Sequence, residues 1–489
     1  MNRQIRWLAM AFVILFVVLF AQVNYIQVFG AKGLANNPAN RRLLLQEYNV
    51  DRGELLARDG KTALAESEPT KGKLKYRRVY PEGPLYGQIT GYYSVLYGRS
   101  GLESSQNDYL SGRAAELLPQ NLVDEILGRD KRGATVVTTI DAELQKLAQE
   151  KLGSLQGAVV ALDPKTGDVL AMAANPSYDP SLLASHSLKT EQRAWKSLNA
   201  DPTKPLLSRA GQELFPPGST FKLVTAAAAL ENGMRPDTLF PNPPELDLPQ
   251  TTHNLHNFGN EHCLGGASQI TLAEALQVSC NVVWAEVGLK LGAEKLVGQA
   301  RRFGFDQNVP FDIPWAEGQI PPARQFKDAL PTLATSAIGQ QSVAANPLQM
   351  ALVASAIANG GIEMRPRLVQ EIRDPSGKIL KTLTPQEFGN PISARTAAEL
   401  TGMMINVVKS GTGTAAQIPG VEVAGKTGTA QTPNGDPHAW FVSFAPATSP
   451  QIVVAVVVLN GGSLGSDATG GVLAAPIAKA LIETWLRGA

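Results

Sequence analysis

A long apolar run near the N-terminus constrains this chain more than any other feature. Residues 7–29 are almost entirely apolar, and Arg3 and Arg6 precede them. As a helix this run would extend ~34 Å, enough to cross the hydrocarbon core of a bilayer. The alternative, a cleaved signal peptide, has a shorter apolar region and a small-residue cleavage site, which residues 28–31 match poorly. We expect a transmembrane helix over 7–29 and a cytoplasmic tail over 1–6, because arginines favour the cytoplasmic side.

The rest of the chain is globular in composition. A chain of 489 residues is too long to fold around a single hydrophobic core. Its content of hydrophobic residues (44%) and charged residues (18%) is that of an ordered globular protein and not of a disordered one. A formal net charge of +1 gives no indication of a nucleic-acid partner. The two cysteines, Cys263 and Cys280, are compatible with a disulfide outside the membrane or with two buried thiols, and spacing alone does not decide.

Strand patterns divide the remaining sequence. Residues 31–132 are polar, with short apolar runs between turns, which indicates a modest β-containing module. Stronger strands follow, and a Pro-Lys-Thr-Gly turn joins the first two of them into a hairpin. The strand patterns are GAVVALD and DVLAMAA, then much later VEVAGKTGTA, AWFVSFAP and QIVVAVVVLN. A long helical insert separates the two groups, which predicts an α+β domain whose sheet combines both ends of the domain sequence.

Ser219 and Lys222 form the first candidate for chemistry. Pro216, Pro217 and Gly218 precede the serine and end any helix behind it. A serine at this position can simply be a helix N-cap. Lys222, however, lies one turn on, where the positive end of the helix dipole would lower its pKa. A neutral lysine can accept the proton of the serine, so the spacing also suits an activated nucleophile.

Two further motifs, Ser-x-Asn and Lys-Thr-Gly, recur along the chain. Ser-x-Asn occurs at 105–107, 197–199 and 279–281, and only the third interrupts a helical pattern in an apolar setting. Ser279 and Asn281 could therefore point into a cleft, or could merely cap the local backbone. Lys-Thr-Gly occurs at 165–167, where turn chemistry explains it, and at 426–428 within a strand.

The second Lys-Thr-Gly is the better candidate for a binding site. A glycine inside a strand suggests close approach by another backbone, such as a substrate peptide. Lys426 and the hydroxyl groups of Thr427 and Thr429 could then hold a carboxylate. Trp440 and Phe441, on the next strand, are expected in the sheet core.

A histidine-rich stretch, HNLHNFGNEHC, offers an alternative metal site. His253, His256, His262 and Cys263 are ligand types for zinc, but their spacing is not a standard one. A polar loop near the cleft is the preferred interpretation.

Taken together, these motifs resemble the class B penicillin-binding proteins, and most of all the actinobacterial penicillin-binding protein A group. The resemblance rests on the order of the three motifs and on several longer stretches. These are YNVDRGELLARDG, GAVVALDPKTGDVLAMAANPSYDP, FPPGSTFK, TLAEALQVSCN, NPLQMALVASAIANGG and AGKTGTAQ. It implies a β-rich pedestal, dimerisation-like, over 30–150 and a transpeptidase domain over 151–489. That domain is expected to hold a five-stranded antiparallel sheet flanked by helices, with a helical subdomain.

The resemblance also implies a role for each motif residue. The serine of the first motif would attack the D-Ala-D-Ala bond of a peptidoglycan stem peptide, with backbone N–H groups of Ser219 and Thr429 as oxyanion hole. The implied catalytic residues are Ser219, Lys222, Ser279 and Asn281, as nucleophile, base, proton relay and orienting amide. The implied substrate-binding residues are Lys426, Thr427, Gly428 and Thr429. A Cys263–Cys280 disulfide is implied as well, whereas a metal or organic cofactor is not.

The implied function is cross-linking of stem peptides through a serine acyl-enzyme, inhibited by β-lactams. The implied location is the cell membrane, with the catalytic domain outside and a polytopic glycosyltransferase as partner. Three alternatives remain: a D,D-carboxypeptidase, a β-lactamase, for which no deacylating acid is found by motif, and a non-enzymatic scaffold or β-lactam sensor.

Overall fold

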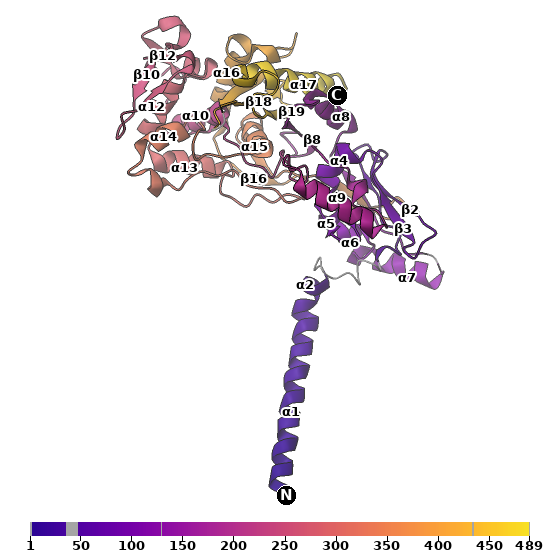
Figure 1. The fold of residues 1–489 in the computed structure, drawn as a ribbon. Coiled ribbons are helices and arrows are strands. Elements are labelled where there is room, and N and C mark those ends of the chain that lie inside the picture. Colours follow the sequence, from indigo (N-terminus) through magenta and orange to yellow (C-terminus); the bar gives the residue numbers. More distant parts are fainter. Residues whose placement is uncertain (1, 36–46, 129, 433–434, 489) are drawn as a thin grey trace.

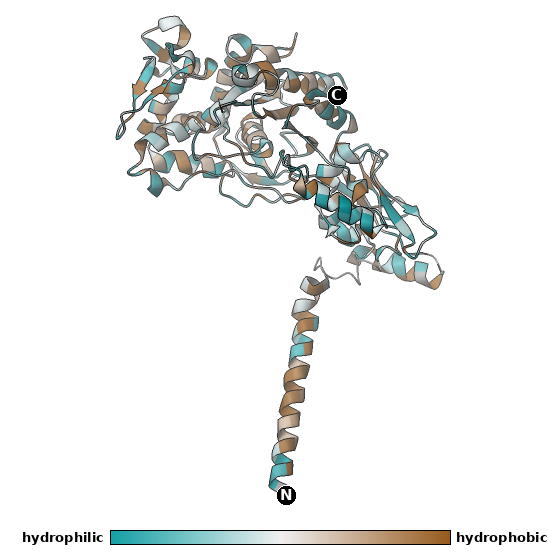
Figure 2. Ribbon diagram, in the orientation of Figure 1, coloured by the Kyte–Doolittle hydropathy of each residue, from teal (hydrophilic) through white to brown (hydrophobic). Residues whose placement is uncertain are grey.

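A computed structural model describes residues 2–35, 47–128, 130–432 and 435–488. One long helix stands away from a two-part body (Figure 1). It comprises α1 (Asn2–Tyr25), a π-helical turn (Ile26–Gly30) and α2 (Ala31–Ala35). Within residues 3–30, an 18-residue stretch has a mean hydropathy of 2.3 and is not buried at all, and Figure 2 shows the apolar character of the helix. The helix therefore has the length and composition of the predicted single-pass anchor.

The smaller part of the body is built on a six-stranded sheet. Its strand order is β15-β14-β6-β1-β2-β3. The bounds are β1 (Leu55–Leu56), β2 (Ala63–Pro69), β3 (Tyr76–Val79), β6 (Thr135–Thr138), β14 (Val369–Arg373) and β15 (Ile379–Thr382). This sheet is the β-rich pedestal that the sequence predicted before the catalytic domain.

Two strands of this sheet come from far along the chain. β14 pairs antiparallel with β6, with Ile372 opposite Val136, and β15 pairs with β14. The division at residue 150 did not anticipate this, because a strand pattern shows which face is buried but not which partner it meets. The pedestal is therefore completed by a segment whose sequence lies within the catalytic domain.

Short helices and a hairpin surround the pedestal sheet. They are α4 (Gly83–Thr90), β4 (Tyr93–Ser94), β5 (Gly98–Arg99), α5 (Gly101–Ser105), α6 (Asn107–Leu110) and α7 (Leu118–Ile126). Beneath them Glu103 is fully buried and accepts hydrogen bonds from Arg52 Nε at 2.6 Å and Arg78 Nε at 2.5 Å. Both oxygens of this buried carboxylate thus face a guanidinium, the arrangement that makes burial of its charge tolerable.

The larger part of the body contains a five-stranded antiparallel sheet of order β17-β18-β19-β7-β8. The bounds are β7 (Gly157–Leu162), β8 (Val169–Asn175), β17 (Ala424–Ala430), β18 (His438–Ala445) and β19 (Ile452–Val458). All five predicted strands are confirmed, as is the turn around residues 164–167 that joins β7 to β8. The two ends of the domain sequence meet where β19 pairs with β7.

Helices cover both faces of this sheet. On one face pack α8 (Ala142–Leu152) and α17 (Ala475–Gly488), and on the other α10 (Lys222–Glu231), α15 (Pro347–Ala358) and α16 (Ala394–Ser410). Successive residues alternate between the faces, so Trp440 packs on one side and Phe441 on the other, both fully buried. The prediction that these two side chains belong to the core is confirmed.

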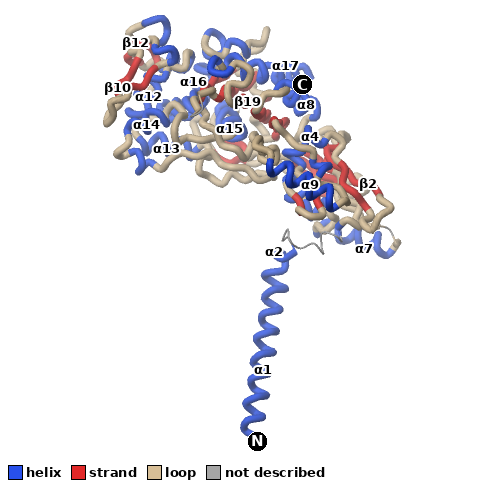
Figure 3. Tube along the Cα trace, viewed as in Figure 1, coloured by secondary structure: helices blue, strands red, loops and turns tan. Residues whose placement is uncertain are grey.

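The remaining helices form the expected helical subdomain, with one outlying helix. They are α9 (Leu188–Ala200), α11 (Leu272–Gln277), α12 (Asn281–Leu291), α13 (Ala293–Arg302) and α14 (Leu330–Ser336). Three small antiparallel pairs accompany them, β9 (Leu239–Pro241) with β12 (Gln269–Thr271), β10 (Glu245–Asp247) with β11 (Asn254–His256), and β13 (Glu363–Met364) with β16 (Glu387–Gly389). In Figure 3 the pairs containing β10 and β12 lie at the edge of the body, far from the pedestal strands. Thr271 and Glu274 form a capping box at the start of α11.

Candidate active site

Ser219 lies in a short 3₁₀-helix (Gly218–Phe221) that leads directly into α10. This helix begins at a glycine with φ of +52°, and Gly218 N–H donates to Gly339 O at 2.9 Å. The residue preceding α10 is Phe221, which makes no side-chain cap. Ser219 is thus not the N-cap of α10, and its side chain lines an open cleft.

Two glycines bring this 3₁₀-helix against strand β17. A Cβ atom on Gly218 would lie 2.9 Å from Thr429 O, and one on Gly428 would lie 3.0 Å from Pro217 O. The sequence predicts that the Gly428 position admits the backbone of a substrate. The structure shows that the backbone approaching it is that of the segment preceding Ser219, so the glycine sets the distance between the serine and β17.

Lys222 is fully buried beneath the cleft, at the start of α10. Its Nζ donates to Ser279 O and to Asn281 Oδ1, both at 2.7 Å, and lies 3.3 Å from Ser279 Oγ. A neutral amine has two hydrogens and one lone pair. Because the two carbonyl oxygens use both hydrogens, the lone pair of a neutral Lys222 is left to accept a proton from a hydroxyl group.

The pKa of Lys222 lies well below its ordinary value, first because of burial and second because of the charge on Lys426. The helix dipole predicts a shift of the pKa in the same direction. Burial dominates instead, since α10 is enclosed along its whole length and no carboxylate is among the hydrogen-bond partners of Lys222.

Ser279 occupies the break between α11 and α12 in an unusual backbone conformation. Its φ is +62°, which is uncommon for a residue with a side chain and costs energy that its surroundings must offset. The conformation places both its carbonyl and its hydroxyl group against Lys222, and its Oγ accepts a hydrogen bond from Lys426 Nζ at 2.9 Å. Neither Ser279 nor Asn281 is a simple backbone cap.

Lys426 approaches the same hydroxyl group from the sheet side. Its fully buried Nζ also donates to Thr427 O at 2.8 Å, and burial lowers its pKa to about 7. Two lysines from different elements, one at the start of α10 and one on β17, therefore converge on Ser279. This convergence could not be deduced from their separation in the sequence.

The cleft has a volume of about 1100 Å³ and runs along β17. Its lining includes the hydroxyl-bearing residues Ser219, Ser279, Thr427 and Thr429, together with Asn281. The structure thus brings all three predicted motifs to one cavity. It also adds Thr412, whose hydroxyl group lies 2.5 Å from that of Thr427 and which the sequence analysis missed. A threonine in the loop after a helix carries no signal of such a contact.

The rejected motif copies lie elsewhere. Asn107 is buried in the pedestal, where its Oδ1 accepts a hydrogen bond from Arg52, and Asn199 lies on α9 and donates to Trp195 O. Lys165 occupies the turn between β7 and β8, with its N–H donating to Asp163. None of these residues is among those that line the cleft.

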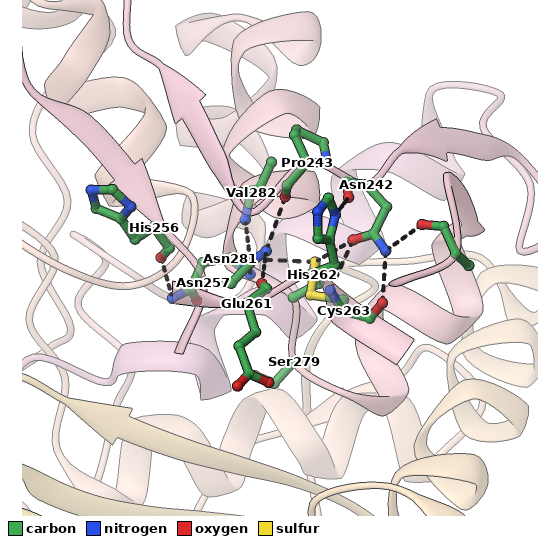
Figure 4. Close-up of a disulfide and its surroundings, with 12 residues drawn as sticks. Asn242, Pro243, His256, Asn257, Glu261, His262, Cys263, Ser279, Asn281 and Val282 are labelled. Carbon is green, nitrogen blue, oxygen red and sulfur yellow. Dashed lines mark hydrogen bonds between the residues drawn. A yellow bond between two sulfur atoms is a disulfide. The ribbon is translucent and has the colours of Figure 1, made fainter. Parts of the chain in front are cut away.

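A disulfide joins Cys263 to Cys280, directly before Asn281 (Figure 4). It ties the 3₁₀-helix Cys263–Gly266 to the start of α12. Asn257 reinforces the same junction, since its Oδ1 accepts hydrogen bonds from the N–H groups of Asn281 and Val282, each at 3.0 Å. Asn257 thus pairs with backbone N–H groups at the start of α12 that have no partner within the helix. The sequence did not predict this role, because Asn257 caps the helix from a distant loop.

The histidines lie on this loop. His253 and His256 line the cleft, and His262 Nδ1 lies 2.6 Å from Asn242 O. Among the residues that the structure describes, no group of three or more histidine, cysteine or acidic side chains could hold a metal ion. The cysteine of the suspected zinc stretch is bonded to Cys280 instead.

Comparison with known proteins agrees with this geometry. The family "Penicillin binding protein transpeptidase domain" matches residues 157–483, and "Penicillin binding protein A dimerisation domain" matches residues 52–136. The peptidoglycan D,D-transpeptidase PbpA of Mycolicibacterium smegmatis is 43% identical, over 100% of this chain and 99% of its own length. The PbpA of Mycobacterium tuberculosis is 40% identical over the full length of both chains.

Solved structures lead to the same family. Penicillin-binding protein A from M. tuberculosis in its penicillin G acyl-enzyme complex has a TM-score of 0.84 at 40% identity, covering 89% of this chain and 100% of that one. Its ceftriaxone acyl-enzyme complex has a TM-score of 0.85 at 39% identity, covering 90% of this chain and 99% of that one. The chain belongs to the penicillin-binding protein transpeptidase family, as a class B member similar to the mycobacterial penicillin-binding protein A.

Proposed function

We propose that this protein is a peptidoglycan D,D-transpeptidase that cross-links stem peptides through an acyl-enzyme on Ser219. One observation carries the assignment of roles. The Nζ of Lys222 is buried, has a pKa well below its ordinary value and hydrogen-bonds to two carbonyl oxygens, beneath a cleft that Ser219 lines. A lone pair in that position is suited to accept the proton of an attacking hydroxyl group.

In the first half-reaction Ser219 Oγ attacks the carbonyl carbon between the two D-alanines, and its proton passes to Lys222. Ser279, which contacts both lysines, carries a proton to the nitrogen of the leaving D-alanine as the peptide bond breaks. Asn281 holds Lys222 in place through its Oδ1. The products of this step are free D-alanine and an ester between the peptide and Ser219.

The substrate would lie along β17, the edge strand of the central sheet. Lys426, Thr427 and Thr429 would bind its terminal carboxylate, with Gly428 keeping this strand close to Ser219. The backbone N–H groups of Ser219 and Thr429 would stabilise the oxyanion, each by roughly 3 kcal/mol. An amine of a neighbouring stem peptide then attacks the ester, forms the cross-linking amide and releases Ser219.

The lining of the cleft favours a long-lived ester over fast hydrolysis. Among the described residues that line it, none is aspartate or glutamate, so none supplies a carboxylate to activate water against the ester. This supports a transpeptidase that β-lactams trap, rather than a β-lactamase.

The anchor suggests the arrangement of the protein in the cell. We place residues 1–6 in the cytoplasm, 7–29 in the membrane and both folded domains outside, with a polytopic membrane glycosyltransferase as the partner that supplies glycan strands. Arg3 and Arg6 support this orientation. Reporter fusions at the two ends of the chain test it, and activity of an extracytoplasmic reporter at the N-terminus would contradict it.

Two measurements test the function. Intact-mass spectrometry after incubation with benzylpenicillin should show one covalent adduct, absent in Ser219→Ala. A pentapeptide donor with an added amine acceptor should yield a cross-linked product with release of D-alanine. Release of D-alanine with only the shortened peptide would indicate a carboxypeptidase, and an adduct retained in Ser219→Ala would overturn the nucleophile assignment.

A further inference from the structure

Helix α7 of the pedestal exposes its apolar face to solvent. Leu118, Leu122 and Ile126 are 57%, 60% and 76% exposed. At 3.6 residues per turn these three side chains fall within an arc of roughly 80°. On the opposite side Asp124 is buried at 6% exposure, and Asn121 donates to Gly112 O at 2.7 Å. The helix therefore turns polar residues toward the pedestal and an apolar stripe away from it, the reverse of an ordinary surface helix.

This stripe differs from the other exposed apolar residues of the body. Val123 and Leu127, which flank it, are also more than half exposed, at 53% and 57%. In the described chain beyond α2, each of the remaining large apolar side chains that are exposed belongs to a different segment: Leu182, Leu188, Leu239, Phe258, Leu264, Ile379, Leu464 and Val472. Single exposed residues are ordinary, whereas a cluster on one helix indicates a contact surface.

The position of α7 relates this surface to the membrane anchor. Glu47, the first described residue after the anchor segment, forms an ion pair with Arg113 at 2.8 Å, and Arg113 lies five residues before α7. Eleven residues (36–46) connect Ala35 to Glu47, which can span no more than about 40 Å. Figure 1 shows α7 at the end of the body that faces α1.

Basic side chains lie beside the stripe. The turn between β2 and β3 carries Lys71, Lys73 and Lys75, all exposed. Lys75 Nζ contacts Asp130 Oδ1 at 2.9 Å, four residues after the end of α7. The contact places the lysine turn next to the C-terminal end of α7 and neutralises the acidic group there. Apolar side chains beside lysines are the combination by which helices bind an anionic lipid surface.

We propose that α7 is a second membrane contact of this protein, with its apolar stripe inserted at the boundary between headgroups and acyl chains, and with the lysine turn against anionic headgroups. The proposal rests on the anchor and not on the proposed transpeptidase activity. The lysine turn favours lipid over a protein helix as the occupant. Anionic headgroups present negative charge over the whole bilayer surface, whereas a protein helix would need acidic residues at the positions that face these lysines. Together with the anchor, this contact would hold the pedestal at the membrane in one orientation.

Depth-dependent quenching in vesicles tests the proposal with the full-length chain. Because the two native cysteines are bonded to each other, a cysteine introduced as Ile126→Cys can be labelled selectively with an environment-sensitive fluorophore. In vesicles containing phosphatidylglycerol, the label should emit at shorter wavelength than in detergent and lose intensity when brominated lipids are included. The control is Leu239→Cys on β9, which is also exposed to solvent, at 57%, and should show neither change.

Two variants test the apolar stripe and the lysine turn separately. With the label moved to Leu118→Cys, the changes Leu122→Asp and Ile126→Asp should abolish quenching, while an unchanged Tm shows that the fold is intact. Replacing Lys71 and Lys73 by glutamine should weaken quenching and remove its dependence on anionic lipid. Quenching at residue 126 no stronger than at residue 239 would overturn the proposal. A shift in emission without quenching would also overturn it, because it would show that protein covers the stripe.

Discussion

Glu363 on β13 is a carboxyl group enclosed without a partner. Its side chain is 0% exposed, and both of its oxygens lack a hydrogen bond within the part of the chain that the structure describes. The side-chain amide of Gln349, which approaches Gly304 as Glu363 Oε1 does, donates to Phe303 O and accepts from Gly318 N–H. Burial raises the pKa of Glu363 from 4.5 to about 8, so we expect the group to be protonated in the folded protein at neutral pH.

The consequence for stability follows from proton linkage. Between pH 4.5 and about 8 the folded state keeps a proton that the unfolded state has lost, so the free energy of unfolding falls as pH rises through this window. Each pH unit corresponds to ~1.4 kcal/mol, which gives a loss of up to ~5 kcal/mol by pH 8. Glu363→Gln removes the titrating proton while keeping the shape of the side chain.

Thermal unfolding of the full-length protein in detergent, measured at intervals from pH 5 to 9, tests this reasoning. The variant and the wild type should have similar Tm values near pH 5, and the variant should exceed the wild type by roughly 5–10 °C at pH 8. Glu387→Gln, an exposed position on the partner strand β16, is the matched control and should follow the wild type. A Tm difference between Glu363→Gln and wild type that stays constant with pH would refute the argument.

Three further predictions concern the cleft. Lys222→Met should slow acylation by benzylpenicillin by roughly 10²–10⁴-fold with little change in Tm, and a rate within a few-fold of wild type would exclude Lys222 as the base. The pKa of Lys426 near 7 predicts that capture of carboxylate-bearing β-lactams weakens as pH rises above that value, because the ammonium group loses its charge; stopped-flow acylation across pH 6–9 would show this, and a rate that keeps rising would contradict it. Replacing Cys263 and Cys280 by serine should cost ~3 kcal/mol of stability, as expected for a 17-residue separation, and should lower the acylation rate by loosening Asn281; unchanged unfolding and acylation would show that the bond is dispensable.

Local pattern was sufficient to predict much of this fold from the sequence. The five strands of the central sheet alternate or run apolar in ways that only buried strands do, and the turn between β7 and β8 contains residues that favour turns. The spacing of Ser219 and Lys222, one turn apart, likewise predicts from local sequence that the two residues act together. These features depend on neighbours in the sequence, which is why they could be read from it.

Features that depend on distant partners could not be predicted. The pairing of β14 with β6 needs a register that no local pattern specifies. The contacts of Asn257 with α12, and of Thr412 with Thr427, join a loop to an element far along the chain. The cause of the low pKa at Lys222 was misassigned for the same reason, since the extent of burial is a property of the whole fold.

The late strands of the pedestal sheet have a consequence for biosynthesis. A ribosome that has released β1, β2, β3 and β6 has still not produced β14, so the emerging sheet keeps an unpaired edge at β6 until much of the catalytic domain has followed. The pedestal sheet therefore cannot be completed by the residues before 150 alone. Truncation after residue 150, a natural choice for expressing the pedestal alone, would leave that edge open to aggregation, whereas a chain extended through residue 382 would close it.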